Sequence, residues 1–334
     1  MGVDALTTTG ITARRFVIVG GAGFIGAHFV DRLLGGPEVQ SVTVFDNFSS
    51  GRRWHLTAVE ADPRLTVVNA DVKDLSALVK AMTGNDTVIH LASNPDIARA
   101  ATEPSVDFDE GTLLTHHVVE AMRIAGAGTL LYASGSGVYG DLGLLEAGED
   151  HGPMLPISTY GASKLAGEAL IVSYCHMFGL VGRAFRFGNV VGPRQTHGVG
   201  FDFVRRLLKD PRQLPILGDG TQSKSYIHVE DVIAAVLTAL STEEAPYRVY
   251  NVATGDYITV TEIAELAADC LGLAPGSVDF QYTGGDRGWK GDVPSVRLNT
   301  DRIRALGWSN RRNSREALRD SMLAMIPDAR SGRL

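Results

Sequence analysis

A glycine-rich stretch near the N-terminus constrains the fold of this chain more than any other feature. The β-branched run RFVIV at residues 15–19 leads directly into GGAGFIG at residues 20–26. The spacing of Gly20, Gly23 and Gly26 predicts a tight turn that opens into a helix. Because glycine has no Cβ, a pyrophosphate can approach the backbone there, and the helix N-terminus offers free N–H groups and a positive dipole end. The stretch therefore predicts a strand–turn–helix unit that binds a phosphate group.

An acidic residue at the end of the next strand completes this pattern. The strand predicted over residues 41–46 ends at Asp46, 20 residues after Gly26. A carboxylate at this position holds a ribose 2′-hydroxyl group and repels a 2′-phosphate. The two motifs together predict a dinucleotide site that binds NAD in preference to NADP. Arg52 and Arg53, which lie nearby, are the residues that weaken this preference.

Strand and helix patterns alternate along the first part of the chain. Stretches with helical spacing separate further apolar β-branched runs, which cover residues 65–71, 86–93, 128–135 and 182–192. This alternation predicts an α/β fold with a doubly wound parallel sheet, the Rossmann architecture. After about residue 190 the pattern loosens, and glycine and proline become frequent. We therefore expect a dinucleotide-binding domain at 14–190, to which part of the later chain returns, and a smaller mixed α/β substrate lobe at 191–330.

The bulk properties exclude several classes of protein. The 334 residues carry a formal net charge of −7 and no long basic run, so we expect no nucleic-acid partner. No window approaches the roughly 20 apolar residues of a membrane-spanning helix, and residues 1–16 predict a short loose leader without the apolar core of a signal peptide. Cys175 and Cys270 have no metal-ligand spacing, which predicts no metal site. These features favour a soluble cytoplasmic protein with a small-molecule ligand and no membrane contact.

A tyrosine and a lysine lie four positions apart in ISTYGASKLAGEAL, at residues 157–170. On a helix this spacing places Tyr160 and Lys164 on one face, about one turn apart. Tyrosine normally loses its proton near pH 10, so its use as a base near neutrality requires a nearby positive charge. Lys164 can supply that charge, and a cationic nicotinamide ring would act in the same sense. With a nearby serine or threonine, the pair could take a proton from an alcohol while hydride leaves its carbon.

Two other strand ends carry polar residues of interest. Asp71 could accept a hydrogen bond from an adenine amino group, and its alternative role is a helix N-cap, for which Asp74 is better placed. The segment HLAS at residues 90–93 ends the fourth strand, where small side chains would let the backbone approach the nicotinamide-side ribose and phosphates. We interpret His90 as a buried structural residue, because histidines at the ends of buried strands are usually satisfied core groups.

Taken together, these motifs resemble those of the extended short-chain dehydrogenases/reductases, in particular the nucleotide-sugar epimerase/dehydratase family. The likeness runs from about residue 14 to 325 and includes HLAS, SGSGVYG, PISTYGASK and RFGNVVGP in the family's order. The segments ILGDGTQSKSYIHVEDV and GGDRGWKGDVP are most similar to the UDP-glucose (galactose) 4-epimerase branch. The resemblance implies tightly bound NAD, a nucleotide-sugar substrate, a homodimer, and epimerisation at C4 through transient oxidation to a 4-keto sugar and re-reduction on the opposite face.

The resemblance also implies roles for individual residues. Tyr160 would be the catalytic base, Lys164 would tune it, and Ser134 or Ser136 would bind the sugar hydroxyl. The implied substrate contacts are these serines and Tyr160, with Asn189, Lys224 and Arg287 on the nucleotide diphosphate and Arg194 as the cation for a glucuronate carboxylate. With the residues argued above, the expected cofactor contacts are Gly20, Gly23, Phe24, Ile25, Gly26, Asp46, Asn47, Ser49, Ser50, Gly51, Asp71, Val72, Leu91, Ala92, Ser93, Ala133, Tyr160, Lys164 and Phe187.

The chain departs from the family pattern at several positions. Gly135 stands where relatives usually place the catalytic serine or threonine, and Gly111 where they usually have an asparagine. Dehydratases and decarboxylases carry an acidic residue shortly before Tyr139, whereas this chain has Ser136 and Gly137. Without that carboxyl group water elimination lacks its acid/base, which favours a UDP-glucose/UDP-galactose 4-epimerase. The alternatives are a UDP-glucuronate 4-epimerase, another nucleotide-sugar dehydratase or decarboxylase, and a non-catalytic NAD-binding regulator.

Overall fold

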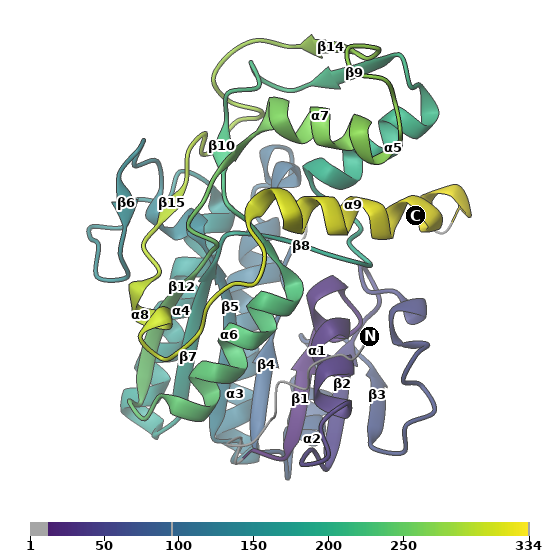
Figure 1. The fold of residues 1–334 in the computed structure, drawn as a ribbon. Helices are drawn as coiled ribbons and strands as arrows, with labels where there is room; N and C mark the ends of the chain where they lie inside the picture. The colour runs from purple at the N-terminus through teal and green to yellow at the C-terminus, as the bar shows by residue number, and fades with distance from the viewer. Residues whose placement is uncertain (1–12, 95, 333–334) are drawn as a thin grey trace.

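The computed structural model describes residues 13–94 and 96–332 of the chain. Residues 1–12, which make up most of the expected leader, lie outside this described part. A seven-stranded parallel sheet forms the centre of the molecule (Figure 1). Its strands, in spatial order, are β12 (Tyr247–Val252), β7 (Val181–Phe187), β5 (Thr129–Gly135), β4 (Thr87–His90), β1 (Arg15–Val19), β2 (Ser41–Asp46) and β3 (Leu65–Asn69).

Helices cover both faces of this sheet, as a doubly wound fold requires. Phe16 and Ile18 of β1 belong to one apolar core, and Val17 and Val19 belong to the other. Successive side chains of a strand point to opposite faces, so a strand buried on both faces must be apolar at every position. The first core includes α1 (Phe24–Leu34) and α6 (Val229–Thr242), and the second includes α2 (Leu75–Met82), α3 (Leu113–Ala125) and α4 (Thr159–Phe178).

The later chain builds a smaller second lobe at one end of the sheet (Figure 1). Its core is formed by α5 (Val199–Lys209), α7 (Val260–Cys270) and α9 (Ser314–Arg330). The rest of the described molecule includes the short helix α8 (Asp301–Arg304) and pairs of short strands outside the central sheet. The pairs are β9 (Gln213–Ile216) with β14 (Asp279–Tyr282), β10 (Ser223–Lys224) with β13 (Ile258–Thr259), β11 (Tyr226–His228) with β8 (Asn189–Val191), and β15 (Arg297–Leu298) with β6 (Glu146–Ala147).

Three elements of the later chain return to the first lobe: α6, β12 and α8, whose Ile303 lies in the same core as α6. α6 packs in the same core as α1, and β12 pairs with β7 as the outermost strand. The chain order of the strands reverses around β1 and β4, and ligands of doubly wound folds bind at the carboxyl ends of the strands at such a point. Four short helical turns lie in the loops, namely η1 (Arg53–Leu56), η2 (Ile97–Ala101), the π-helical η3 (Phe108–Thr112) and η4 (Ser136–Tyr139). Among the described residues, no helix has both the length and the apolar character needed to cross a bilayer.

Candidate active site

The glycine-rich turn approaches the end of β4 too closely for side chains. Gly20 has a φ of 84°, and a Cβ there would lie 2.8 Å from the backbone nitrogen of Ala92. A Cβ on Gly26 would collide with the carbonyl oxygen of Gly20. No side chain caps the N-terminus of α1, so Phe24 and Ile25 present bare backbone N–H groups. The turn therefore has the geometry that pyrophosphate binding needs.

Asp46 ends β2 beside this turn. Its carboxylate accepts hydrogen bonds from the backbone N–H groups of Ala22 at 2.9 Å and Phe48 at 2.8 Å. Burial raises the pKa of this carboxyl group, while the two backbone hydrogen bonds lower it. A Cβ on Gly51 would lie 2.7 Å from the Asp46 carboxylate, so the following loop passes close to it. Asp46 thus fixes the turn and the loop in one geometry and keeps lone pairs for a ribose hydroxyl group.

A side-chain hydrogen bond joins the ends of β2 and β3. Asn47 donates from Nδ2 to Oδ2 of Asp71 at 2.9 Å, and the backbone N–H of Ser49 donates to Oδ1 of Asn47 at 3.0 Å. Asp74, and not Asp71, caps α2 by accepting the N–H of Ala77, as the sequence predicted. The other expected cofactor residues lie in the same turns or at neighbouring strand ends: Gly23, Ser50, Val72, Leu91 and Phe187.

The N-terminal half of α4 carries Tyr160 and Lys164 on one face. Ser158 caps this helix by accepting the N–H of Gly161 at 3.1 Å. Lys164 is 3% exposed and donates from Nζ to the carbonyl oxygen of Ala133 on β5 at 2.8 Å. The same nitrogen lies 5.5 Å from the centre of the Tyr160 ring. The sheet therefore fixes the ammonium group about one turn from the phenol, as the sequence predicted.

Burial shifts the pKa of both groups. It raises the pKa of Tyr160 above its ordinary value of about 10, and a hydrogen bond with Ser93 lowers this pKa while Asp107 raises it. Burial lowers the pKa of Lys164 to about 8, and Asp107 opposes this change. Burial is the largest cause of the raised pKa of Tyr160, and the expectation that Lys164 lowers this pKa stays a prediction. A second positive charge is needed to make the phenolate near neutrality.

The structure separates the two candidate serines. The Ser134 hydroxyl donates to Oε1 of the buried Glu168 at 2.6 Å, and the residue is 4% exposed. This bond directs the hydroxyl proton of Ser134 to the interior and favours Ser136 of the two candidates for the sugar hydroxyl. Ser136 begins η4 and is half-buried. A Cβ on Gly135 would meet no atom within 4 Å, so open space lies where the resemblance places a hydroxyl-bearing side chain.

A buried polar network anchors the inner side of α4. Arg186 on β7 donates to both oxygens of Glu168, at 3.0 and 2.6 Å, and to the hydroxyl of Tyr139 at 2.8 Å. Tyr139 donates in turn to Oδ1 of Asn251 on β12 at 2.8 Å. The network therefore joins the catalytic helix to two strands of the sheet and to the turn that carries Ser136.

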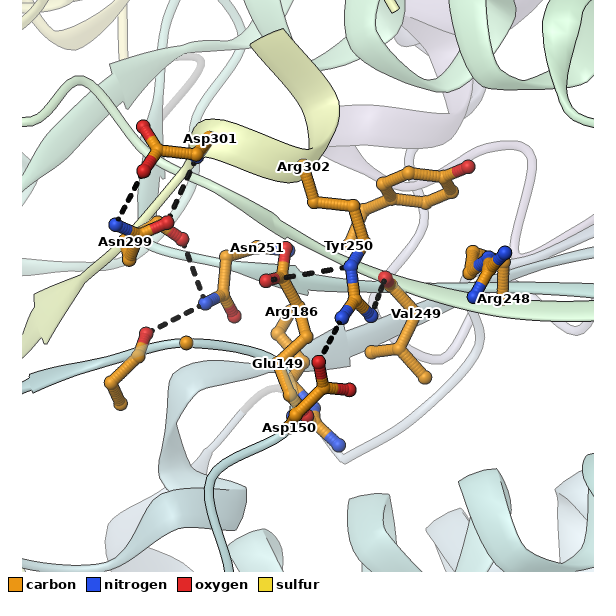
Figure 2. Close-up of polar contacts among 12 residues, drawn as sticks. Glu149, Asp150, Arg186, Arg248, Val249, Tyr250, Asn251, Asn299, Asp301 and Arg302 are labelled. Carbon is orange, nitrogen blue, oxygen red and sulfur yellow. Dashed lines mark hydrogen bonds and ion pairs between the residues drawn. The ribbon is translucent and has the colours of Figure 1, made fainter. Parts of the chain in front are cut away.

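Figure 2 shows how this network continues at the edge of the sheet. Asn251 donates from its side chain to the carbonyl oxygens of Ala147 and Asn299, both at 2.9 Å. Arg302 on α8 pairs with Asp150 at 2.6 Å. These contacts hold two distant segments, the loop around 146–150 and the chain around 299–302, against β12.

The cations expected to bind phosphates lie close together in the second lobe. Nζ of Lys224 lies 2.6 Å from Oδ1 of Asp292, and Arg287 donates to the backbone carbonyl oxygen of the same residue. Arg287 also pairs with Asp141 at 2.6 Å, and Asn189 lies at the exposed start of β8. Asp292 thus brings together two cations that are far apart in the sequence.

Arg194, the cation expected for a glucuronate carboxylate, is held by contacts with the first lobe. Its backbone has a φ of 64°, and its guanidinium lies 2.6 Å from Oδ2 of Asp31 on α1. The same group donates to the carbonyl oxygen of His55 at 2.7 Å. Because these partners on the first lobe hold the guanidinium, Arg194 is not placed to bind the carboxylate of a sugar.

His90 is a buried core residue, in agreement with its interpretation from the sequence. Its Nε2 lies 3.2 Å from the hydroxyl of Thr115, and burial together with the charge of Lys164 lowers its pKa to about 3. This histidine therefore stays neutral. Among the described residues, no group of histidine, cysteine and acidic side chains could hold a metal ion.

The carboxylate of Asp107, which was not predicted as a site residue, lies beside the start of α4. Asp107 accepts hydrogen bonds from Nδ2 of Asn94 at 2.9 Å and from the hydroxyl of Thr159 at 2.6 Å. It directly precedes η3, in which a Cβ on Gly111 would lie 2.7 Å from Oγ of Ser163. Gly111 is therefore required for close packing of η3 against α4. The sequence gives no signal for Asp107, because an aspartate before a helix is typical of any cap.

Comparisons with known proteins agree with this geometry. The model of the NAD dependent epimerase/dehydratase family matches residues 16–253. The chain is 33% identical over 302 residues to the UDP-glucose 4-epimerase of Mycolicibacterium smegmatis, which covers 88% of this chain and 93% of the relative.

Solved structures of similar proteins include both epimerases and dehydratases. A crystal structure of a UDP-galactose 4-epimerase has a TM-score of 0.82 and 36% identity, covering 94% of this chain and 99% of the other. The dTDP-glucose 4,6-dehydratase DesIV from Streptomyces venezuelae, with NAD and TYD bound, has a TM-score of 0.86 and 29% identity, covering 94% of this chain and 97% of the other. The fold alone therefore does not separate the two reactions.

Proposed function

Because this chain belongs to the NAD-dependent epimerase/dehydratase family, we propose that it is a UDP-sugar 4-epimerase that interconverts UDP-glucose and UDP-galactose. One observation carries this proposal. Tyr160 and Lys164 form the acid–base pair on α4, whereas Ser136 and Gly137 stand where a dehydratase needs a carboxyl side chain before Tyr139. Water elimination then has no acid/base at the leaving hydroxyl, while epimerisation at C4 requires only the tyrosine.

The first lobe fits the NAD that the family requires. The turn at Gly20 and Gly26 leaves no room for side chains, and the uncapped start of α1 offers N–H groups to a pyrophosphate. Asp46 stands at the carboxyl end of β2, where it suits a ribose hydroxyl. We propose that residues 14–190, with β12 and α6, hold the dinucleotide. When bound, NAD supplies a reversible hydride acceptor for C4 of the sugar.

Tyr160 is the proposed acceptor and donor of the C4 hydroxyl proton. Burial raises the pKa of Tyr160, so its phenolate needs nearby positive charge. The ammonium of Lys164, fixed on the carbonyl of Ala133, supplies one such charge, and the oxidised nicotinamide supplies another. Ser136 is the serine that we propose for the sugar hydroxyl, since Glu168 holds Ser134.

The second lobe is the proposed anchor of the nucleotide. Lys224 and Arg287 meet at Asp292, and cations of this kind suit a diphosphate. We propose that residues 191–330, with Asn189 at the lobe boundary, bind the nucleotide diphosphate and leave the sugar free to turn. A turning sugar can then present either face of C4 to the same acid–base pair.

The test is a direct assay of sugar products. Purified protein is incubated with UDP-glucose and, separately, with UDP-glucuronate, and the nucleotide sugars are separated by chromatography. We expect UDP-galactose from the first reaction. Tyr160→Phe should lose almost all turnover while keeping its fold by circular dichroism, because it removes only the ionisable hydroxyl. The absence of any C4 epimer would refute the proposal, and a dehydrated or decarboxylated product would assign the chain to a neighbouring branch.

Two alternatives make different predictions in the same assay. A UDP-glucuronate epimerase needs a cation for the sugar carboxylate, and Asp31 holds the candidate Arg194, which disfavours that substrate. A non-catalytic NAD-binding regulator would give no product with either sugar. It would keep its partner binding in Tyr160→Phe.

We also propose a homodimer in the cytoplasm. Large apolar residues are exposed on or beside α3 and α4, including Phe108, Ile124, Met177 and Phe178. Pairing of two copies through these helices would cover them. Cys175 and Cys270 are both free thiols, which suits a reducing compartment. Light scattering of the purified protein tests the dimer.

A further inference from the structure

Asp107 is a buried carboxylate for which the proposed reaction has no assigned role. It lies between η2 and η3 and is 1% exposed. Its two oxygens accept hydrogen bonds from Asn94 and Thr159, both neutral side chains. In the described part of the chain it takes part in no direct ion pair. Burying a carboxylate without a paired cation costs free energy of folding, so the position of Asp107 beside α4 needs an explanation.

The two hydrogen-bond partners of Asp107 are sequence neighbours of Tyr160 and of Ser93, the residue that hydrogen-bonds with the Tyr160 phenol. Thr159 is the first residue of α4 and directly precedes Tyr160, and its hydroxyl lies 2.6 Å from Oδ2 of Asp107. Asn94 directly follows Ser93, which hydrogen-bonds with the phenol. The carboxylate therefore joins the two segments that hold Tyr160 from either side.

The position of the charge is favourable in two respects. A carboxylate at the N-terminal turn of α4 interacts with the positive end of the helix dipole. Lys164, one turn further along the helix, is a buried cation that interacts electrostatically with Asp107, and its Nζ donates to the carbonyl of Ala133. These two interactions offset the burial of a carboxylate that has no direct partner.

We propose that Asp107 is a positioning residue of the catalytic pair, which anchors the start of α4 through Thr159 and contributes a negative charge to the buried site of Lys164. The inference rests on the function proposed above, because it assigns Asp107 to the acid–base chemistry of Tyr160. Asp107 itself touches neither the reacting atoms nor the cofactor in this account. It acts through Lys164 and through the geometry of the helix start.

The sign of the electrostatic effect can be worked out from the surrounding groups. The negative charge of Asp107 raises the pKa of both Lys164 and Tyr160. In the described part of the chain, the other titratable groups that face this pair are the neutral His90 on β4, the buried Tyr132 on β5, and Glu168, whose charge Arg186 balances. Asp107→Asn therefore removes the one unbalanced negative charge among them. Both pKa values should fall, and both limbs of the activity profile should move to lower pH.

The decisive test measures Lys164 directly, without turnover. Lysine occurs at only six positions in the chain, so NMR titration of 13Cε-lysine in the NAD-loaded protein can resolve Lys164, assigned with Lys164→Arg. We expect Asp107→Asn to lower the pKa of Lys164 by on the order of one unit, the size typical of a lost nearby opposite charge. Asp109→Asn, two residues away on η3, is the matched control and should leave this pKa unchanged.

Two further variants separate charge from anchoring. Thr159→Val removes the hydrogen bond but keeps the carboxylate, so it should lower the melting temperature while the Lys164 pKa stays near its original value. If Asp107→Asn folds poorly, Asp107→Glu replaces it in the test. This variant keeps the negative charge, so the pKa of Lys164 should stay near its original value. An unchanged Lys164 pKa in folded Asp107→Asn would overturn the inference. Because this reading needs no substrate, it stays valid even if the protein proves not to be an epimerase.

Discussion

At the level of single residues, the proposed chemistry depends on the positive charge of Lys164, which loses its proton at a lower pH than an ordinary lysine. Burial lowers the pKa of Lys164 to about 8, and in the proposed mechanism its charge stabilises the phenolate of Tyr160. A buried ammonium releases its proton as the pH rises through its pKa. We therefore expect kcat/KM to fall as the pH rises through about 8. In Lys164→Arg the charge persists, so this fall should disappear from the residual activity. A fall of the same shape in the arginine variant would contradict the role of Lys164.

Residue positions that depend on short-range spacing could be predicted from the sequence. Gly20, Asp46 and the pair on α4 follow from local patterns that fix a turn, a strand end and a helix face. Other assignments depend on partners that are distant in the sequence. Only the fold shows that Glu168 takes the hydroxyl of Ser134, or that Asp31 takes the guanidinium of Arg194. No local pattern distinguishes these residues from free ones.

At the scale of secondary-structure elements, a buried ion pair fixes α4 against the sheet. Arg186 and Glu168 are 2% and 5% exposed and form two hydrogen bonds. Glu168→Ala should lower the free energy of unfolding by about 3–5 kcal/mol, because it leaves a guanidinium buried without its partner. Denaturant unfolding followed by circular dichroism measures this change. We also expect reduced turnover, since the same helix carries Tyr160.

The exposed pair of Arg99 and Glu103 is the matched control for this prediction. Glu103→Ala should leave the unfolding midpoint nearly unchanged, because water and salt screen an exposed pair. If the two variants were equally destabilised, the loss at Glu168 would reflect a general effect of removing acidic residues. The role assigned to the buried pair would then be wrong.

Most elements could be predicted from apolar periodicity, and the exceptions have physical reasons. In the central sheet, β1, β4 and β5 carry buried apolar side chains on both faces. β3 lies at one edge and is partly exposed, although its run LTVVN was also predicted as a strand. β12 was not predicted as a strand of this sheet. It lies at the edge, and its sequence YRVYNV includes Arg248 and Asn251, which interrupt the apolar run. The π-helical η3 could not be predicted, because its extra residue has no periodic signal.

At the scale of the whole molecule, the chain passes repeatedly between the two lobes. α5 belongs to the second lobe, α6 and β12 return to the first, and α7 and α9 belong to the second again. Unfolding of either lobe would therefore disrupt segments that are directly connected to the other lobe. We expect a single calorimetric transition rather than one for each lobe. Two resolved transitions, or a proteolytic fragment of residues 14–190 that stays folded alone, would contradict this coupling.

The arrangement of the lobes could be anticipated from the sequence only in outline. The loosening of the pattern after about residue 190 indicated a second lobe, and the return of later chain was expected. The contacts that fasten the later chain depend on residues far apart in sequence, such as Asn251 with Ala147 and Asn299. Such contacts become visible only when the sheet order is known.

The central claim is that Tyr160 and Lys164 serve a reversible oxidation at C4 that returns its hydrogen to the same carbon. The most direct measurement is NMR of the products formed from UDP-glucose deuterated at C4 in ordinary water. The account predicts UDP-galactose that retains deuterium at C4, and no such product from Tyr160→Phe. A 4-keto-6-deoxy product, or UDP-galactose in which the label has exchanged with solvent, would contradict it.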